Sequence, residues 1–151
     1  MVTATQTALG TPPSELKYWV ALNRVPGIGR VRYQSLLSGF GSLAAAWAAG
    51  PGDMRSAGVD PRTARLIAAE RGAIDPDDEM AQIEKAGVQA VTWPDPLYPT
   101  ALKETDDPPP VLYVRGDISA AHDFAVAVVG TRRPTPYGRQ VAEEVSYQLA
   151  A

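Results

Sequence analysis

The sequence predicts a small helical domain followed by the beginning of an α/β domain. Over residues 14–73, apolar residues recur at helical spacing between turns that contain Gly or Pro, which is typical of a helical bundle. From residue 74 onward, short apolar runs alternate with helical patterns, and this alternation is typical of α/β folds. Residues 1–13 are rich in Thr, Ala and Pro, a composition that predicts a disordered tail.

The helical domain opens with two helices joined by a glycine hairpin. Ser14 is the expected N-cap of the first helix, and the run Val25-Pro26-Gly27-Ile28-Gly29 separates it from the second. Helix, Gly-Ile-Gly turn and helix are typical of a helix-hairpin-helix element, in which glycines let the backbone approach a phosphate and the second helix offers free N–H groups. Gly27, Gly29 and Arg30 are therefore secondary candidates for DNA binding. A tight turn with a scaffolding or protein-contact role explains the same pattern, and we favour it for this hairpin.

A degenerate second copy of this unit follows. Ser42 is expected to cap a short helix, and the run Ala57-Gly58-Val59-Asp60-Pro61 then leads into another helical pattern. Asp60 stands where the second hairpin glycine would be, and Asp before Pro is a favourable helix start. Two such units predict a compact bundle of SAM-like shape over residues 14–73.

The α/β part is expected to start with a helix and to contain three strands. Asp75 and Pro76, followed by three acidic residues, favour a helix start. Gly87 is expected to end this helix. The strands are expected at residues 88–93, 111–115 and 124–129. The last of these runs is apolar throughout and rich in valine, which is typical of a buried parallel strand.

A Gly-Thr-Arg-Arg turn connects the third expected strand to a helix that begins near Tyr137. A strand, a glycine turn and a helix N-terminus form an anion site, because free N–H groups and the positive helix end face the same point. Arginine adds a bidentate donor for phosphate. The spacing matches neither the dinucleotide fingerprint nor the Walker A loop. The candidate phosphate-binding residues are Gly130, Thr131, Arg132 and Gly138, with Arg133 as a secondary candidate because neighbouring side chains diverge.

Two motifs in this chain resemble the signatures of one family. Residues 130–138 read Gly-Thr-Arg-Arg-Pro-Thr-Pro-Tyr-Gly and are similar to G-[ST]-R-x-x-x-x-Y-G. Residues 98–116 are similar to Y-P-x-x-L followed by D-P-P-x-V-L-Y-x-x-G. Both signatures belong to the DNA-processing protein A family (DprA, also called Smf), which the chain resembles over roughly residues 15–151.

The resemblance implies a fold and a function. It implies an extended Rossmann-like domain that binds single-stranded DNA and helps to load RecA during natural transformation and recombination. It also implies that Arg132 contacts the DNA backbone and that the full-length protein forms a homodimer. In the family, a lysine and further strands beyond the position of Ala151 complete the Rossmann domain. The chain is therefore expected to be an N-terminal fragment whose second domain, residues 74–151, is truncated.

Composition and charge predict a cytoplasmic protein without cofactor or metal. The sequence has no apolar run of membrane-spanning length, no signal-peptide pattern and no cysteine. Its formal net charge is −3, but the charge is unevenly distributed. Residues 1–72 carry eight basic residues against four acidic ones, and residues 73–117 carry three against ten. This asymmetry is a weak indication of nucleic-acid binding at the basic parts, and solvated surface explains it equally well.

The sequence holds few catalytic signatures. The single histidine, His122, falls in an expected loop, and the serines lie outside any nucleophile-elbow pattern. We therefore predict a protein that binds phosphates without catalysis and is not an enzyme. The alternative is a Rossmann-type enzyme acting on a nucleotide or phosphoribosyl small molecule. A further interpretation makes the helical domain a protein-docking module.

Overall fold

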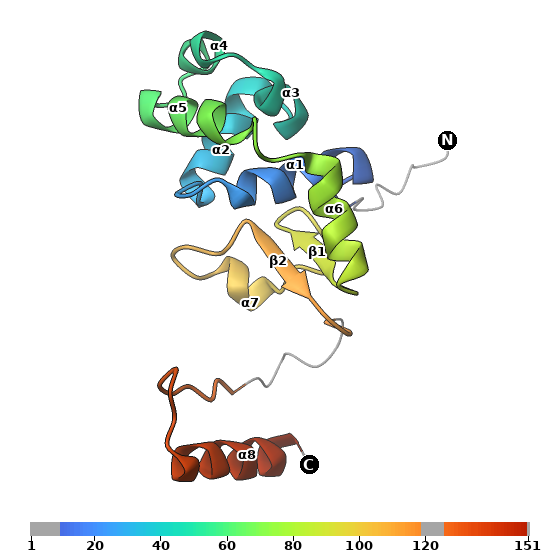
Figure 1. Ribbon diagram of the computed structural model, residues 1–151, viewed down its shortest axis with the longest axis vertical. Coiled ribbons are helices and arrows are strands. Elements are labelled where there is room, and N and C mark those ends of the chain that lie inside the picture. The colour runs from blue at the N-terminus through green and yellow to red at the C-terminus, as the bar shows by residue number, and fades with distance from the viewer. Residues whose placement is uncertain (1–9, 119–125, 151) are drawn as a thin grey trace, which may run out of the picture. The chain divides into compact units, whose positions relative to one another are not determined.

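The computed structural model describes residues 10–118 and 126–150 (Figure 1). These ranges belong to two separately packed units, which divide the chain after Ser119. Residues 1–9 of the expected tail, His122, and Phe124 and Ala125 of the third expected strand lie outside the described residues.

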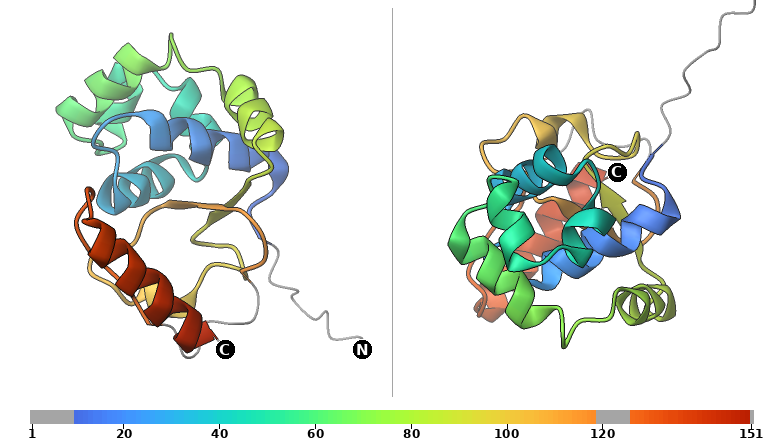
Figure 2. Two further views of the ribbon diagram at one scale, coloured as in Figure 1. Left: turned by 60° about the horizontal axis from the view of Figure 1, so that its bottom comes forward. Right: turned by 90° about the horizontal axis from the view of Figure 1, so that it is seen from above.

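The first unit is mainly helical, and Figure 2 shows α1 to α5 gathered together with α6 standing beside them. Its elements in chain order are α1 (Pro13–Arg24), α2 (Arg30–Phe40), α3 (Leu43–Ala48), α4 (Pro51–Ser56), α5 (Pro61–Glu70), α6 (Pro76–Lys85), β1 (Gln89–Thr92), α7 (Thr100–Lys103) and β2 (Val111–Val114).

Side-chain caps and prolines determine where several helices begin. Ser42 caps α3, Asp60 caps α5 and Asp75 caps α6 through bonds to backbone N–H groups, as the sequence predicts. The expected cap at Ser14 is wrong, because α1 already begins at Pro13. The fixed φ angle of proline suits the first helical position, where its missing N–H group costs nothing.

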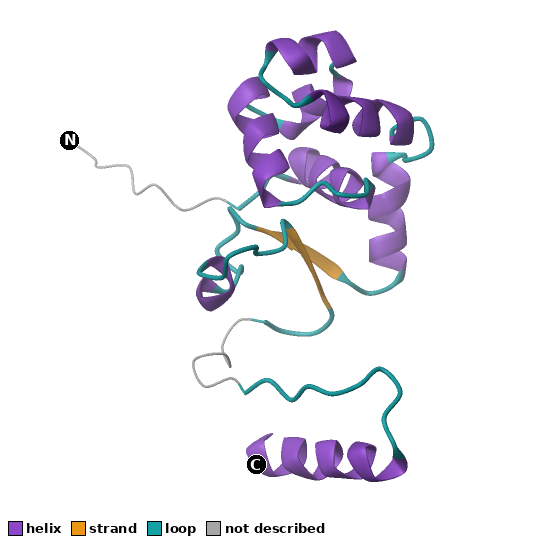
Figure 3. Ribbon diagram, turned by 90° about the vertical axis from the view of Figure 1, so that its left-hand side faces the viewer, coloured by secondary structure: helices purple, strands orange, loops and turns teal. Residues whose placement is uncertain are grey.

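An aromatic cluster joins α1, α2 and β1 in the first unit, where α1 lies between α2 to α5 on one side and the two strands on the other (Figures 1 and 3). The rings of Trp19 and Tyr33 stack with centroids 5.0 Å apart. Trp93 follows β1 and meets both rings edge-on, at centroid distances of 6.1 Å. The buried Tyr33 hydroxyl donates to the Trp19 carbonyl at 2.6 Å, and burial raises the pKa of this phenol. The cluster joins the sheet to the helices.

Helix α6 also packs on α1, although it lies beyond the predicted domain boundary. The Lys17 ammonium lies 2.9 Å from the Asp77 carboxylate, and the Arg24 guanidinium lies 3.3 Å from the Glu79 carboxylate. Residues 10–118 thus belong to one packed unit, and the division of the chain between residues 73 and 74 stays a prediction.

The two strands form an antiparallel pair. Gln89 lies opposite Val114 and Thr92 opposite Val111, so the first two strands do not follow the parallel order of an α/β sheet. The connection between them is a proline-rich loop that contains only the short α7, whereas parallel neighbours need a crossover that is usually a full helix. A Rossmann-like domain therefore stays a prediction for the described residues.

The second unit consists of an irregular segment, residues 126–135, and α8 (Pro136–Ala150). The third expected strand is wrong in its described part, because residues 126–129 adopt no strand conformation. A strand needs ladder partners for its N–H and C=O groups, and the Val129 side chain is 89% exposed here. Helix α8 begins one residue before Tyr137, close to the expected start. No helix in the described ranges is both long and apolar enough to cross a bilayer.

Candidate nucleic-acid interface

The glycine hairpin between α1 and α2 has an open tip. Gly27 adopts a φ of +78°, a conformation that other residues rarely take. The buried Ile28 anchors the turn, and its N–H donates to the Val25 carbonyl at 3.3 Å. Gly29 precedes α2, which has no side-chain N-cap. A Cβ atom added at Gly29 would meet no other group within 4 Å, so the backbone at this position is accessible.

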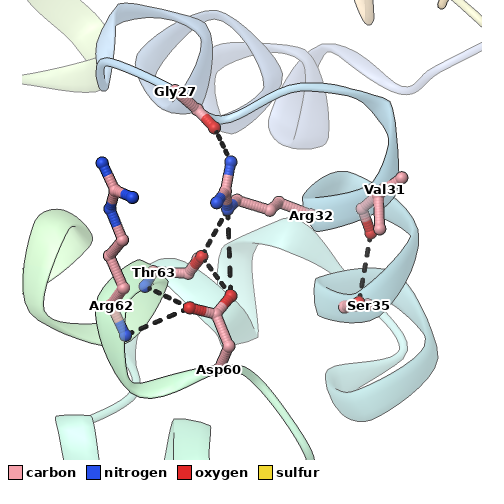
Figure 4. A network of polar contacts seen from close by, with 7 residues as sticks. All are labelled: Gly27, Val31, Arg32, Ser35, Asp60, Arg62 and Thr63. Carbon is pink, nitrogen blue, oxygen red and sulfur yellow. Dashed lines mark hydrogen bonds and ion pairs between the residues drawn. The ribbon is translucent and has the colours of Figure 1, made fainter.

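Arg32 connects the first hairpin, residues 25–29, to the turn of the second copy, residues 57–61, which we call the second hairpin (Figure 4). Its guanidinium donates to the Gly27 carbonyl and, at 2.6 Å, to the Thr63 hydroxyl. The same group lies 3.8 Å from the Asp60 carboxylate. In the sequence Arg32 flanks the hairpin, and in the structure its Nε and Nη1 groups donate to partners within the protein. These contacts of Arg32 stabilise the first hairpin.

The second hairpin is closed by its own side chain (Figure 4). The Asp60 carboxylate accepts bonds from the N–H groups of Arg62 and Thr63, at 3.1 and 3.0 Å, and from the Thr63 hydroxyl at 2.5 Å. The hydrogen bond from this hydroxyl is the main cause that lowers the pKa of Asp60. These N–H groups begin α5, where an external anion would bind. The two hairpins therefore differ, since only the first lacks such a cap.

Arg30 connects the first hairpin to the proline-rich loop. Its guanidinium donates to the Asp106 carbonyl at 3.2 Å. The next residue, Asp107, lines a hollow of about 660 Å³ together with Gly27, Gly29 and Arg30. Two sequence motifs separated by more than seventy residues thus meet at one hollow, which the sequence did not predict.

Tyr98 holds the proline-rich loop in place. Its side chain is buried, and its hydroxyl donates to the Pro109 carbonyl at 2.8 Å. The Lys103 ammonium lies 5.5 Å from the centre of the ring. This arrangement fixes the part of the loop that leads to Asp107.

The predicted phosphate turn lies in the second unit. Gly130, Thr131 and Gly138 line a hollow of about 820 Å³ beside the first turns of α8. Arg133 and Arg139 line the same hollow, whereas Arg132 is exposed outside its lining. The structure therefore brings Gly130, Thr131 and Gly138 together, which are three of the four primary candidates, and places the secondary candidate Arg133 in the same lining. Their role in binding stays a prediction.

Thr135 provides a helix cap that was not predicted from the sequence. The Thr135 hydroxyl accepts a bond from the Gly138 N–H at 3.1 Å, and the Thr135 carbonyl accepts one from the Arg139 N–H at 3.0 Å. Thr before Pro at the start of a helical pattern is a recognisable helix start. The Gly138 N–H, expected to face a phosphate, is used within the chain.

The described residues offer little to hold a metal. Across residues 10–118 and 126–150, His, Asp and Glu side chains form no cluster of three that could bind a metal ion. Each of the two hollows is lined by two arginines, which bind anions, together with acidic residues: Asp60 and Asp107 at the hairpin, and Glu143 beside α8.

Comparisons with known proteins agree with the two motifs. Residues 14–73 match the family model described as DprA-like N-terminal HHH domain, and residues 89–151 match the model described as DNA recombination-mediator protein A. Protein Smf of Synechocystis sp. is 33% identical over 143 residues, which cover 90% of this chain and 35% of that protein. DNA processing protein DprA of Bacillus subtilis is 32% identical over 71 residues, 46% of this chain and 24% of that protein. The chain thus spans about a third of the length of the Synechocystis relative, and no solved structure gives a significant match.

Proposed function

Because this chain belongs to the DprA/Smf family, we propose that it serves in DNA processing during natural transformation and recombination. In this proposal it binds single-stranded DNA through the phosphate backbone and helps to load RecA onto the strand. The names of the two relatives, Protein Smf and DNA processing protein DprA, support a role in DNA processing. They do not favour the alternative of an enzyme acting on a nucleotide or phosphoribosyl compound.

The observation that carries the proposal is the gathering of anion-binding groups at the turn before α8. Gly130, Thr131 and Gly138 line one hollow with two arginines, Arg133 and Arg139, and with one acidic residue, Glu143. Guanidinium groups form bidentate bonds to phosphate, and threonine donates a further bond. Contacts of this kind neutralise a phosphate backbone with little base readout. The proposed role is binding without catalysis.

The fold of the second unit supports the Rossmann-like part of the proposal. The apolar side chains of Val141, Val145 and Leu149 lie along one side of α8 and are 38%, 40% and 56% exposed. An apolar stripe on a helix is normally buried against a sheet or another helix. We propose that α8 and the segment before it belong to such a layered domain. Cytoplasmic localisation, contact with RecA and homodimer formation of the full-length protein belong to the same proposal.

Replacement of Arg132 tests the proposed function. In a full-length protein, Arg132→Ala is expected to weaken binding to oligo-dT and to mixed sequences about equally, by roughly ten- to a hundredfold. The slope of log affinity against log salt should fall by about 0.7, the single-strand value for one lost phosphate contact. Fluorescence anisotropy over a salt series measures both quantities. Arg133→Ala is measured beside it, because the Arg133 side chain lines the hollow and that of Arg132 does not. The family resemblance predicts the larger loss for Arg132→Ala, whereas binding in the hollow predicts it for Arg133→Ala.

A structural role for Arg132 would give a different result. In that case Arg132→Ala would lower the melting temperature and leave the salt slope of the folded protein unchanged. An unchanged slope would remove Arg132 from the binding site.

A further inference from the structure

Two hollows of the first unit share one wall. The hairpin hollow, of about 660 Å³, includes Asn23 in its lining. A second hollow of about 420 Å³ is lined by Asn23, Arg24, Gln82 and Tyr113, among others. Because Asn23 lines both, the hollows are neighbours at the C-terminal end of α1. We call this combined surface the α1 groove, and its members used below are Asn23, Gly29, Arg30, Gln82, Asp107 and Tyr113.

The hairpin end of the α1 groove suits a phosphate. The backbone at Gly29 is open, as no group lies within 4 Å of an added Cβ atom. Arg30 donates to a backbone carbonyl, and this partner carries no negative charge that would neutralise the guanidinium. By contrast, Arg24 lies 3.3 Å from the carboxylate of Glu79. Arg30 is therefore the groove cation best placed to attract an anion.

The other end of the α1 groove suits a nucleobase. The Tyr113 side chain projects from β2 and is 46% exposed. Its hydroxyl accepts a bond from the Asn23 amide at 3.3 Å, which restrains the ring. A restrained, exposed aromatic ring is a stacking platform for a base. The amides of Asn23 and Gln82 supply donors and acceptors for base edges.

We propose that the α1 groove is a contact surface for single-stranded nucleic acid, with a phosphate at Gly29 and Arg30 and a base stacked on Tyr113. A single strand fits because the faces of its bases are free, whereas a duplex hides them in its stack. The proposal takes its ligand class from the proposed function. Its residues are not those of the turn before α8, since every member of the groove lies within residues 10–118.

Asp107 gives this surface an opposing charge. Its exposed carboxylate lines the hairpin hollow beside Arg30, where it repels a phosphate. Its neighbour Asp106 contributes its carbonyl to Arg30 and is not part of the lining. The pair therefore offers a matched test, because both changes to asparagine remove one negative charge from adjacent positions of the same loop.

The test uses the 151-residue chain with two fluorescein-labelled probes of equal length, oligo-dT and an abasic deoxyribose-phosphate oligomer. Tyr113→Leu is expected to weaken oligo-dT binding about five- to a hundredfold, the range for loss of one stacked base, and to leave abasic binding unchanged. Tyr113→Phe, which keeps the ring, should retain most of the oligo-dT affinity. Arg30→Gln should weaken both probes and lower the salt slope by about 0.7.

The aspartates complete the test with a gain of affinity. Asp107→Asn is expected to strengthen the binding of both probes, and Asp106→Asn to change it less. A circular dichroism melt of each variant checks that the unit remains folded. Equal loss of both probes in Tyr113→Leu, or no loss of either, would overturn the inference.

The failure of this inference and that of the proposed function give distinct results. If Arg132→Ala weakens oligo-dT binding while all groove variants bind as the unmodified chain does, the inference fails and the proposed function stands. If the groove variants change binding as expected and Arg132→Ala leaves oligo-dT binding unchanged, the groove is the contact surface and the turn before α8 is not. If the unmodified chain binds neither probe, both are refuted for this chain.

Discussion

Replacing Trp93 with alanine is expected to destabilise the helices of the first unit, although this residue lies well beyond the predicted helical domain. Trp93 meets Trp19 and Tyr33 edge-on at 6.1 Å, and these two residues belong to α1 and α2. Removal of the indole therefore opens the aromatic cluster from the side of the sheet.

The expected loss follows from burial and ring contacts. Truncation of a fully buried Trp to Ala costs about 3–5 kcal/mol, and each aromatic pair adds about 0.5–1.5 kcal/mol beyond its buried area. Because Trp93 is only partly buried, we expect a loss of about 2–3 kcal/mol, below the fully buried range. For a domain of this size the melting temperature should fall by about 10 °C or more.

Thermal unfolding followed by far-ultraviolet circular dichroism measures this effect, because the signal comes mainly from the helices. We expect a single transition in the unmodified chain and a single, lower transition in Trp93→Ala. Tyr113→Leu is the control from the same sheet, and the melting temperature should change little because that ring is exposed. A helical transition that does not move in Trp93→Ala would refute the reasoning and would show that residues 14–73 unfold independently.

Two further predictions concern the hairpins. Gly27→Val is expected to destabilise the unit by about 1–2 kcal/mol because of the left-handed backbone at that position, whereas Gly29→Val should leave the melting temperature nearly unchanged; equal melting temperatures would contradict this. The lowered pKa of Asp60 means that its ionised form stabilises the fold above the pKa of the unfolded state, about 3.9, and that this contribution is lost as the pH falls through the folded-state value. Melting temperatures between neutral and strongly acidic pH should therefore fall less steeply in Asp60→Asn, and an unchanged slope would contradict the assignment.

Helix starts were the most predictable part of this fold. Ser42, Asp60 and Asp75 cap their helices through N–H groups two or three residues away, so the pattern is contained within a few letters of sequence. Thr135 follows the same rule and was identifiable from the proline after it. Ser14 is the exception, since a preceding proline took the first helical position.

Contacts between distant segments were not predictable in this way. Arg30 bonds to a residue 76 positions away, and Arg32 to one 31 positions away. No local pattern distinguishes these two arginines, which differ by two positions in one helix. The antiparallel pairing of β1 and β2 also depends on the path of the loop between them. The predicted third strand had the correct composition, but the described residues offer it no ladder partner.

The hydrogen bonds between Asp60 and the start of α5 limit how many anions the first unit can bind at its two hairpins. A tethered group competes with free ligands at an effective concentration on the order of millimolar. The Asp60 carboxylate, bonded to the N–H groups of Arg62 and Thr63 at 3.1 and 3.0 Å, therefore excludes weaker external anions from the second hairpin. If the α1 groove binds a strand, the first unit therefore offers it one hairpin and not two. High avidity for a long strand then has to arise from a second site, either the turn before α8 of the same chain or the first unit of another chain.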